Sequence, residues 1–113
     1  TAGGKLLLAH LPLELRKNYL KTAQLSRFTE NTLVHKDTLE EELDRILALG
    51  YSVNREEYAI GIMAIGVPIV DKNGTAMSAL ALHAPIARLS IEDGLKSLDR
   101  LKRAAEELGR IWL

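Results

Sequence analysis

The spacing of apolar residues changes along this chain, and the change predicts both helices and strands. In four segments the apolar side chains recur every three or four positions, as on one face of an amphipathic helix. These segments cover residues 5–11, 13–22, 37–49 and 90–109. The third segment is the best marked, because Asp37 and Glu40 have the spacing of a capping box and Gly50 stands where a left-handed C-cap is expected.

Between the third and fourth helical segments the apolar residues become almost continuous, which is typical of paired strands. We expect longer strands over residues 58–70 and 75–84 and a short strand at 51–53. The turn signal Asp71-Lys72-Asn73-Gly74 joins the longer strands and predicts an antiparallel hairpin. Pro68 has no amide hydrogen, so we expect it at a sheet edge or a bulge. A polar connector over residues 26–36 is expected to form turns.

This order of elements predicts an α+β domain with helices against one face of a small antiparallel sheet. Two long strands alone make a marginal sheet. The chain also begins without Met, at Thr1, where a helix is expected to start. We therefore expect residues 1–113 to be one N-terminally truncated domain, with further strands supplied by preceding chain or by a partner.

Composition excludes several classes of protein. Lys plus Arg and Asp plus Glu are equal at 15 each, so the chain lacks the basic excess of a nucleic-acid-binding module. No apolar run has the length of a membrane span. Cysteine is absent, which removes disulfides, thiolate nucleophiles and Cys-based zinc sites and is compatible with a reducing cytosol.

The polar residues predict no catalytic or metal-binding group. Glu56 and Glu57 are adjacent, but neighbouring strand residues point to opposite faces and do not easily share a proton or a substrate. The histidines at positions 10, 35 and 83 match no metal-ligand spacing. His83 has two readings: a rim histidine, or a polar group at the mouth of a pocket. Gly3-Gly4 at a helix start suits an anion, although no phosphate-binding motif surrounds it.

Small residues inside the strands predict space over the sheet. They are Gly61, Ala64, Gly66, Ala79 and Ala81. Ile62 and Ala64 share one face of the first strand, and Ala79, Ala81 and His83 share one face of the second. If these faces coincide, the sheet has an apolar floor with a polar edge, which describes a small-molecule site better than a catalytic one.

Five stretches carry the most distinctive sequence: TAGGKLLLAHLP, GYSVNREE, VPIVDKNG, ALALHAPIARL and AAEELGRIW. Together they resemble the C-terminal effector-binding domain of IclR-type bacterial transcriptional regulators, and the resemblance covers nearly the whole chain. It implies a GAF-like antiparallel sheet with flanking helices, from which this chain lacks the first strands. It also implies that the DNA-binding winged helix-turn-helix is absent.

The resemblance further implies a cytoplasmic domain that binds a small metabolite, often an organic acid, and that assembles into dimers or tetramers. Effector binding would alter operator affinity. DNA would be contacted only through the absent N-terminal domain. No enzyme activity, cofactor, metal ion or membrane is implied.

The resemblance also implies an effector site. Two of its positions are helix-start amides, one is the polar residue after the glycine-aromatic turn, and four lie on the paired strands: Ala2, Gly3, Asn54, Ile62, Ala64, Ala81 and His83. Asn54 stands where members commonly have Asp, and Ala81 and His83 stand where some members have Ser. Losing hydroxyls and gaining an imidazole implies a larger or more apolar acid than glyoxylate or pyruvate, with His83 as hydrogen-bond donor or charge partner.

Two rival hypotheses stay open at this point. The chain is a structural dimerisation module if side chains close the pocket. It is a small enzyme on the same scaffold if activity depends on Glu56, Glu57 or His83. Thermal stabilisation by a panel of small organic acids distinguishes an effector sensor from a dimerisation module.

Overall fold

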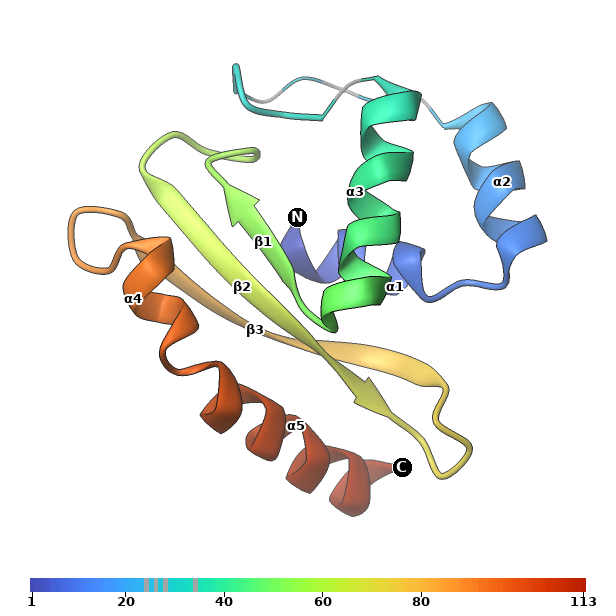
Figure 1. Cartoon of the computed structure of the whole chain (residues 1–113), viewed down its shortest axis with the longest axis vertical. Coiled ribbons are helices and arrows are strands. Elements are labelled where there is room, and N and C mark those ends of the chain that lie inside the picture. The colour runs from blue at the N-terminus through green and yellow to red at the C-terminus, as the bar shows by residue number, and fades with distance from the viewer. Residues whose placement is uncertain (24, 26, 28, 34) are drawn as a thin grey trace.

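The computed structural model describes residues 1–23, 25, 27, 29–33 and 35–113, and it shows a three-stranded antiparallel sheet with helices on both faces (Figure 1). The helices are α1 (Ala2–Ala9), α2 (Leu13–Thr22), α3 (Lys36–Leu49), α4 (Ile91–Leu95) and α5 (Leu98–Trp112). The strands are β1 (Ser52–Arg55), β2 (Ile62–Val70) and β3 (Ala76–Pro85), in the order β1-β2-β3. Part of the predicted polar connector, positions 26, 28 and 34, lies outside the described residues.

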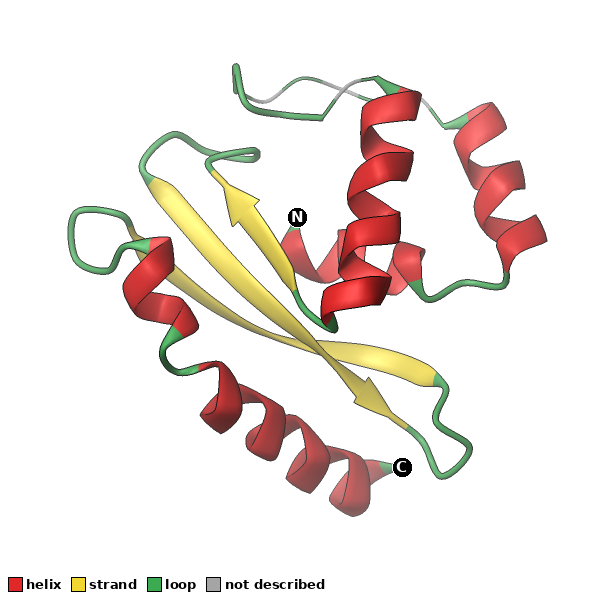
Figure 2. Ribbon diagram, in the orientation of Figure 1, coloured by secondary structure: helices red, strands yellow, loops and turns green. Residues whose placement is uncertain are grey.

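The α+β class is confirmed, but the prediction that helices cover only one face is wrong. Figure 2 shows α1 and α3 on one side of the sheet and α4 and α5 on the other. The cause is the alternation of β2: its odd-numbered residues, Met63, Ile65, Val67 and Ile69, are large and pack under α4 and α5. On the α1 side, Leu6 packs with Leu43 and Ile46 of α3. Two apolar layers therefore enclose the central strand.

The strand register places the small residues in line across the sheet. Two rows of directly opposed residues cross all three strands: Asn54, Ala64 and His83, and next to them Ser52, Gly66 and Ala81. The faces that the sequence assigned separately to two strands therefore coincide.

Several predicted boundaries move. The first helix begins at Ala2, before the predicted start, because the Thr1 Oγ1 atom accepts a hydrogen bond from the Gly4 amide at 3.0 Å. The second strand begins at Ile62 and excludes residues 58–61, because Glu56 and Gly61 have φ values of 59° and 84° and turn the chain there.

The predicted capping box of α3 is wrong. The helix begins at Lys36, with His35 as an N-cap that makes no side-chain hydrogen bond. Asp37 therefore lies inside the first turn, where its carboxylate interacts favourably with the helix dipole but does not cap the helix. The predicted C-cap is confirmed: Gly50 has φ 79° and its amide donates to Ile46 O at 2.8 Å.

The predicted last helix is broken into two. Ser90 caps α4, because its hydroxyl oxygen accepts a hydrogen bond from the Asp93 amide at 3.1 Å. The hydrogen bond that Lys96 donates to the Asp93 carboxylate lowers the pKa of Asp93 below its usual value. Gly94 lies against β2 so closely that a Cβ atom there would be 2.8 Å from Ile65 Cδ1. After the break α5 follows the sheet to Trp112, whose side chain is 72% exposed.

Pro68 lies in the central strand, yet the part of β2 that it occupies is a local edge. β1 pairs only with residues 63–66 of β2, so it has ended before Pro68 is reached. Backbone groups of the even-numbered residues Ala64 and Gly66 point toward β1. The Pro68 nitrogen points the same way, but β1 has no residue opposite it. The missing amide hydrogen therefore costs no ladder bond.

Candidate functional site

All seven predicted site residues lie on the α1 side of the sheet or in α1 itself. Ala2 covers the row of Ser52, Gly66 and Ala81. A Cβ atom on Gly66 would be 2.8 Å from Ser52 Oγ and 3.4 Å from the Ala2 carbonyl carbon and oxygen. The Ser52 hydroxyl donates to Ala2 O at 2.6 Å. In the same way, a Cβ atom on Gly3 would be 3.7 Å from Ala79 Cβ. Space that the sequence assigned to a ligand at Gly66 and Ala79 is therefore filled by α1.

The row of Asn54, Ala64 and His83 crosses the sheet next to the row that the start of α1 covers. In the first turn of α1 only the Gly4 amide has a side-chain acceptor, from Thr1. The Ala2 and Gly3 amides have no intrahelical acceptor at this position, and they add to the positive end of the helix dipole. This arrangement favours a bound anion near the helix start.

The side chain of Asn54 has a defined orientation. Its Oδ1 atom accepts from the Glu57 amide at 2.8 Å, and the residue is 5% exposed. Because the oxygen is engaged, the group that Asn54 offers to a ligand is its NH2 donor. A donor suits a carboxylate, whereas the Asp that the resemblance leads us to expect would present a second negative charge.

A buried ion pair next to Asn54 was missed by sequence reasoning. Lys5 Nζ donates to Val53 O at 2.6 Å and to both Glu57 carboxylate oxygens at 2.9 Å. The side chains of Lys5 and Glu57 are 8% and 12% exposed. The available signal was a lone lysine inside the apolar run of the first helix, for which only a partner distant in sequence allows burial.

A cavity of about 500 Å³ lies beside the start of α1. It is lined by Thr1, Gly4, Lys5, Tyr19, Leu25, Thr32, Leu33, Leu39, Glu57 and Tyr58. The cavity includes none of the seven predicted residues, but Glu57 connects it to Asn54.

The predicted residues differ in their exposure. Ala2, Asn54 and Ala64 are buried, Gly3 and Ala81 are half-buried, and Ile62 and His83 are exposed. The α1 face therefore gathers these residues without surrounding them with one open pocket in the described part of the chain. Among the described residues, no group of three His, Cys, Asp or Glu side chains is placed to hold a metal ion. Nor is any helix there long and apolar enough to cross a membrane.

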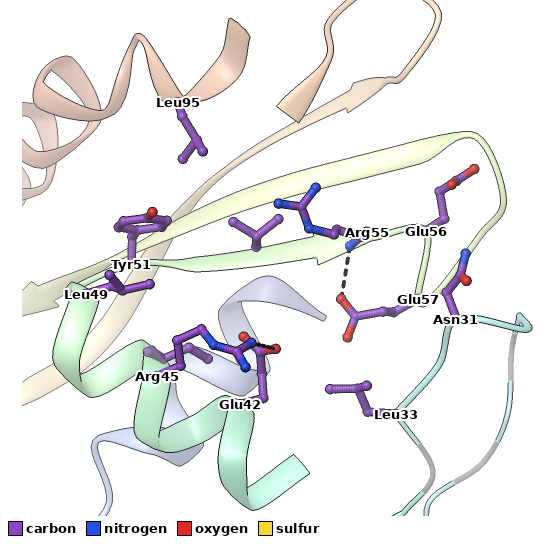
Figure 3. Close-up of a pocket in the computed structure, with 12 residues that line it drawn as sticks. Asn31, Leu33, Glu42, Arg45, Leu49, Tyr51, Arg55, Glu56, Glu57 and Leu95 are labelled. Atoms are coloured by element: carbon purple, nitrogen blue, oxygen red, sulfur yellow. Dashed lines mark hydrogen bonds and ion pairs between the residues drawn. The ribbon is translucent and has the colours of Figure 1, made fainter. Parts of the chain in front are cut away.

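A second groove, which shares Leu33 and Glu57 with the cavity beside α1, runs along the outer edge of β1 and has a volume of about 480 Å³ (Figure 3). Its walls come from α3, β1, the residues after β1, the connector and α4: Asn31, Leu33, Glu42, Arg45, Ile46, Leu49, Tyr51, Val53, Arg55, Glu56, Glu57 and Leu95. We call these residues the β1 groove. Tyr51, just before β1, and Val53 and Arg55 of β1 lie between α3, on the α1 side of the sheet, and Leu95 of α4, on the opposite side, so the groove follows the β1 edge between the two faces.

Comparison with known proteins places the chain in one family. The family described as "Bacterial transcriptional regulator IclR C-terminal" matches residues 1–110. A transcriptional regulator from Paracoccus denitrificans, BhcR, is 39% identical over 106 residues, which cover 93% of this chain and 38% of that protein. The chain thus spans about two fifths of the length of the curated relatives that it matches.

Solved structures agree with the sequence match. The crystal structure of Thermotoga maritima IclR has a TM-score of 0.89 at 39% identity, covering 97% of this chain and 44% of that one. The inducer-binding domain of the transcription factor PobR from Acinetobacter, a double mutant in complex with 3-hydroxybenzoic acid, has a TM-score of 0.90 at 29% identity. That match covers 96% of this chain and 62% of that one.

Proposed function

This chain belongs to the IclR C-terminal family of bacterial transcriptional regulators, and from that premise we propose that it is a ligand-sensing domain for a small organic acid. The observation that carries the proposal is the row of Asn54, Ala64 and His83 beside the start of α1. The Ala2 and Gly3 amides and the Asn54 NH2 group would hold the carboxylate, and His83 would contact the rest of the acid. The complex of a related inducer-binding domain with an aromatic acid supports this class of ligand.

The proposed coupling to transcription is thermodynamic. An effector that prefers one arrangement of a dimer or tetramer shifts the equilibrium of the whole regulator toward that arrangement by its differential affinity. DNA would be bound by a separate N-terminal domain of a cytoplasmic protein. The neutral charge balance of this chain, 15 basic and 15 acidic residues, agrees with that division of labour.

A second candidate follows from burial. Ala2, Asn54 and Ala64 are 0%, 5% and 1% exposed, so an effector enters only if α1 or the connector moves away from the sheet. Without such a movement the chain would be a structural dimerisation module with a filled interior.

Calorimetric titration with a panel of small organic acids, including 3-hydroxybenzoate, separates the two candidates. We expect one acid or more to bind, and we expect His83→Ala to weaken the binding of that acid about tenfold through loss of one hydrogen bond. His35→Ala, an exposed histidine outside the site, should leave the affinity unchanged. Ala64→Leu should abolish binding by filling the floor.

Sedimentation of the same samples reports the oligomeric state with and without acid. If no acid binds while the chain remains a stable oligomer, the structural module is correct. If an acid binds equally well to wild type and to Ala64→Leu, the proposed location is wrong.

A further inference from the structure

We propose that the β1 groove is a second small-molecule site, which takes an acid with a flat aromatic body and lies apart from the proposed effector site. The floor of the groove is apolar and comes from three elements. Ile46 and Leu49 lie on one stripe of α3, Val53 lies on β1 and Leu95 lies on α4. Leu49 is 48% exposed although it faces this floor, so about half of its surface has no cover within the described chain.

The carboxylates on the rim are already engaged. Glu42 pairs with Arg45 at 3.0 Å, and Glu56 Oε1 accepts from the Gly61 amide at 2.9 Å. Glu57 accepts from Lys5 Nζ and from the Arg55 amide. The cations Arg45 and Lys5 therefore offset the charges of Glu42 and Glu57, which reduces their repulsion of an incoming anion. The Gly61 amide that donates to Glu56, in contrast, is uncharged.

The guanidinium of Arg55 is the most available charge. Its partner is the Glu92 carboxylate at 3.8 Å, and these side chains are 62% and 76% exposed. An ion pair of this length and exposure contributes little to stability. Figure 3 shows Arg55 and Arg45 on opposite sides of the groove. Because Arg45 is already paired with Glu42, Arg55 is the arginine placed to bind a carboxylate at the rim.

The backbone of β1 argues against a peptide as the occupant. A strand that paired with this edge would need the outward-facing backbone groups of β1. Lys5 Nζ already occupies Val53 O and the Glu57 carboxylate already occupies the Arg55 amide. A compact ligand that uses the apolar floor and one arginine fits this edge, and a volume of about 480 Å³ suits a two-ring acid.

The test uses naphthalene-2-carboxylate as the probe, with binding measured and located by NMR chemical-shift titration of the whole chain. We expect the shifts to map to Leu49, Val53 and Leu95. Arg55→Gln should weaken binding about tenfold, because a charged hydrogen bond is lost, and neutral naphthalene-2-carboxamide should bind correspondingly weakly to wild type. Shifts confined to Ala64 and His83, or an unchanged affinity in Arg55→Gln, would overturn the proposal.

A matched pair of α3 variants tests the floor. Leu49→Glu places a negative charge in the groove and should abolish binding. Leu47→Glu is the control, because Leu47 is 47% exposed on the same helix but does not line the groove. Equal effects of the two variants would contradict the site.

The result is independent of the proposed effector site. His83 lies on β3, at the sheet edge opposite to β1, so His83→Ala should leave naphthalene-2-carboxylate binding in the groove unchanged. If no organic acid binds near α1 but the probe still shifts the groove residues, the proposed function fails and the groove stands.

Discussion

Lys5 is the residue on which the α1 side of the molecule most depends. Its ammonium group is buried and donates three hydrogen bonds, which tie the first helix to β1 and to the residue that orients Asn54. Buried charges are stable only as long as each keeps its partner. The pair is therefore a positioning device for the proposed donor group of Asn54.

We expect Lys5→Met to destabilise the chain by about 3 kcal/mol, because the Glu57 carboxylate is left buried without its cation. The double change Lys5→Met with Glu57→Gln should recover part of that loss. Urea unfolding measures both variants. Glu42→Gln, which breaks a more exposed pair, is the control and should cost about 0.5 kcal/mol or less. A cost for Lys5→Met no larger than for Glu42→Gln would show that the buried pair contributes little.

Gly66 has a different role, because it determines how closely α1 can approach the sheet. It lies under the carbonyl of Ala2, so the absence of a side chain lets α1 rest on the sheet. The position of the helix start relative to the row of Asn54, Ala64 and His83 follows from this contact.

Gly66→Ala should cost about 2 kcal/mol, because the new Cβ atom would lie 2.8 Å from Ser52 Oγ and would displace the buried hydroxyl that donates to Ala2 O. Gly74→Ala is the matched control. Gly74 has φ 79° and open space around it, so that change costs about 1 kcal/mol from backbone strain alone. Thermal unfolding gives the two costs, and amide NMR shifts in α1 should change only in Gly66→Ala. Unchanged α1 shifts would separate Gly66 from helix placement.

Two local signals that depend on glycine predicted their elements correctly, whereas the capping box at Asp37 and Glu40 did not. The Asp71–Gly74 turn has the Gly74 amide donating to Asp71 O at 3.0 Å, and Gly50 ends α3 as expected. The Lys5–Glu57 pair was not predictable in this way, because its members are 52 positions apart. The small residues were expected to leave room for a ligand, but at Gly66 that room is occupied by α1.

At the scale of the whole molecule, the sheet has two unlike edges. Val53 O and the Arg55 amide bond to Lys5 and Glu57, so these β1 residues face away from β2. By alternation through the register, the Ala81 and His83 backbone groups face the outer edge of β3. One edge is closed by side chains and the other presents its backbone, which makes β3 the edge where a further strand could pair.

Hydrogen exchange measured by NMR tests this difference. The Leu80 and Leu82 amides face β2 and should exchange slowly, whereas the Ala81 and His83 amides between and after them should exchange quickly. The Arg55 amide should be slow although it lies on an edge strand, and it should lose protection in Glu57→Ala. Uniform protection along β3 would mean that its outer edge is already paired in solution.

The exposed end of α5 carries Trp112, and this limits the use of intrinsic fluorescence to measure effector binding. Trp112 is the single tryptophan of the chain, and it lies at the end of the helix that covers the face opposite α1. Its indole is already in water, so an effector held near α1 should leave the emission spectrum almost unchanged. Intrinsic fluorescence would then report no binding even at saturation. Trp112→Phe would remove that background signal. With Tyr58→Trp added, the single tryptophan would line the cavity beside α1, and its emission would report binding there.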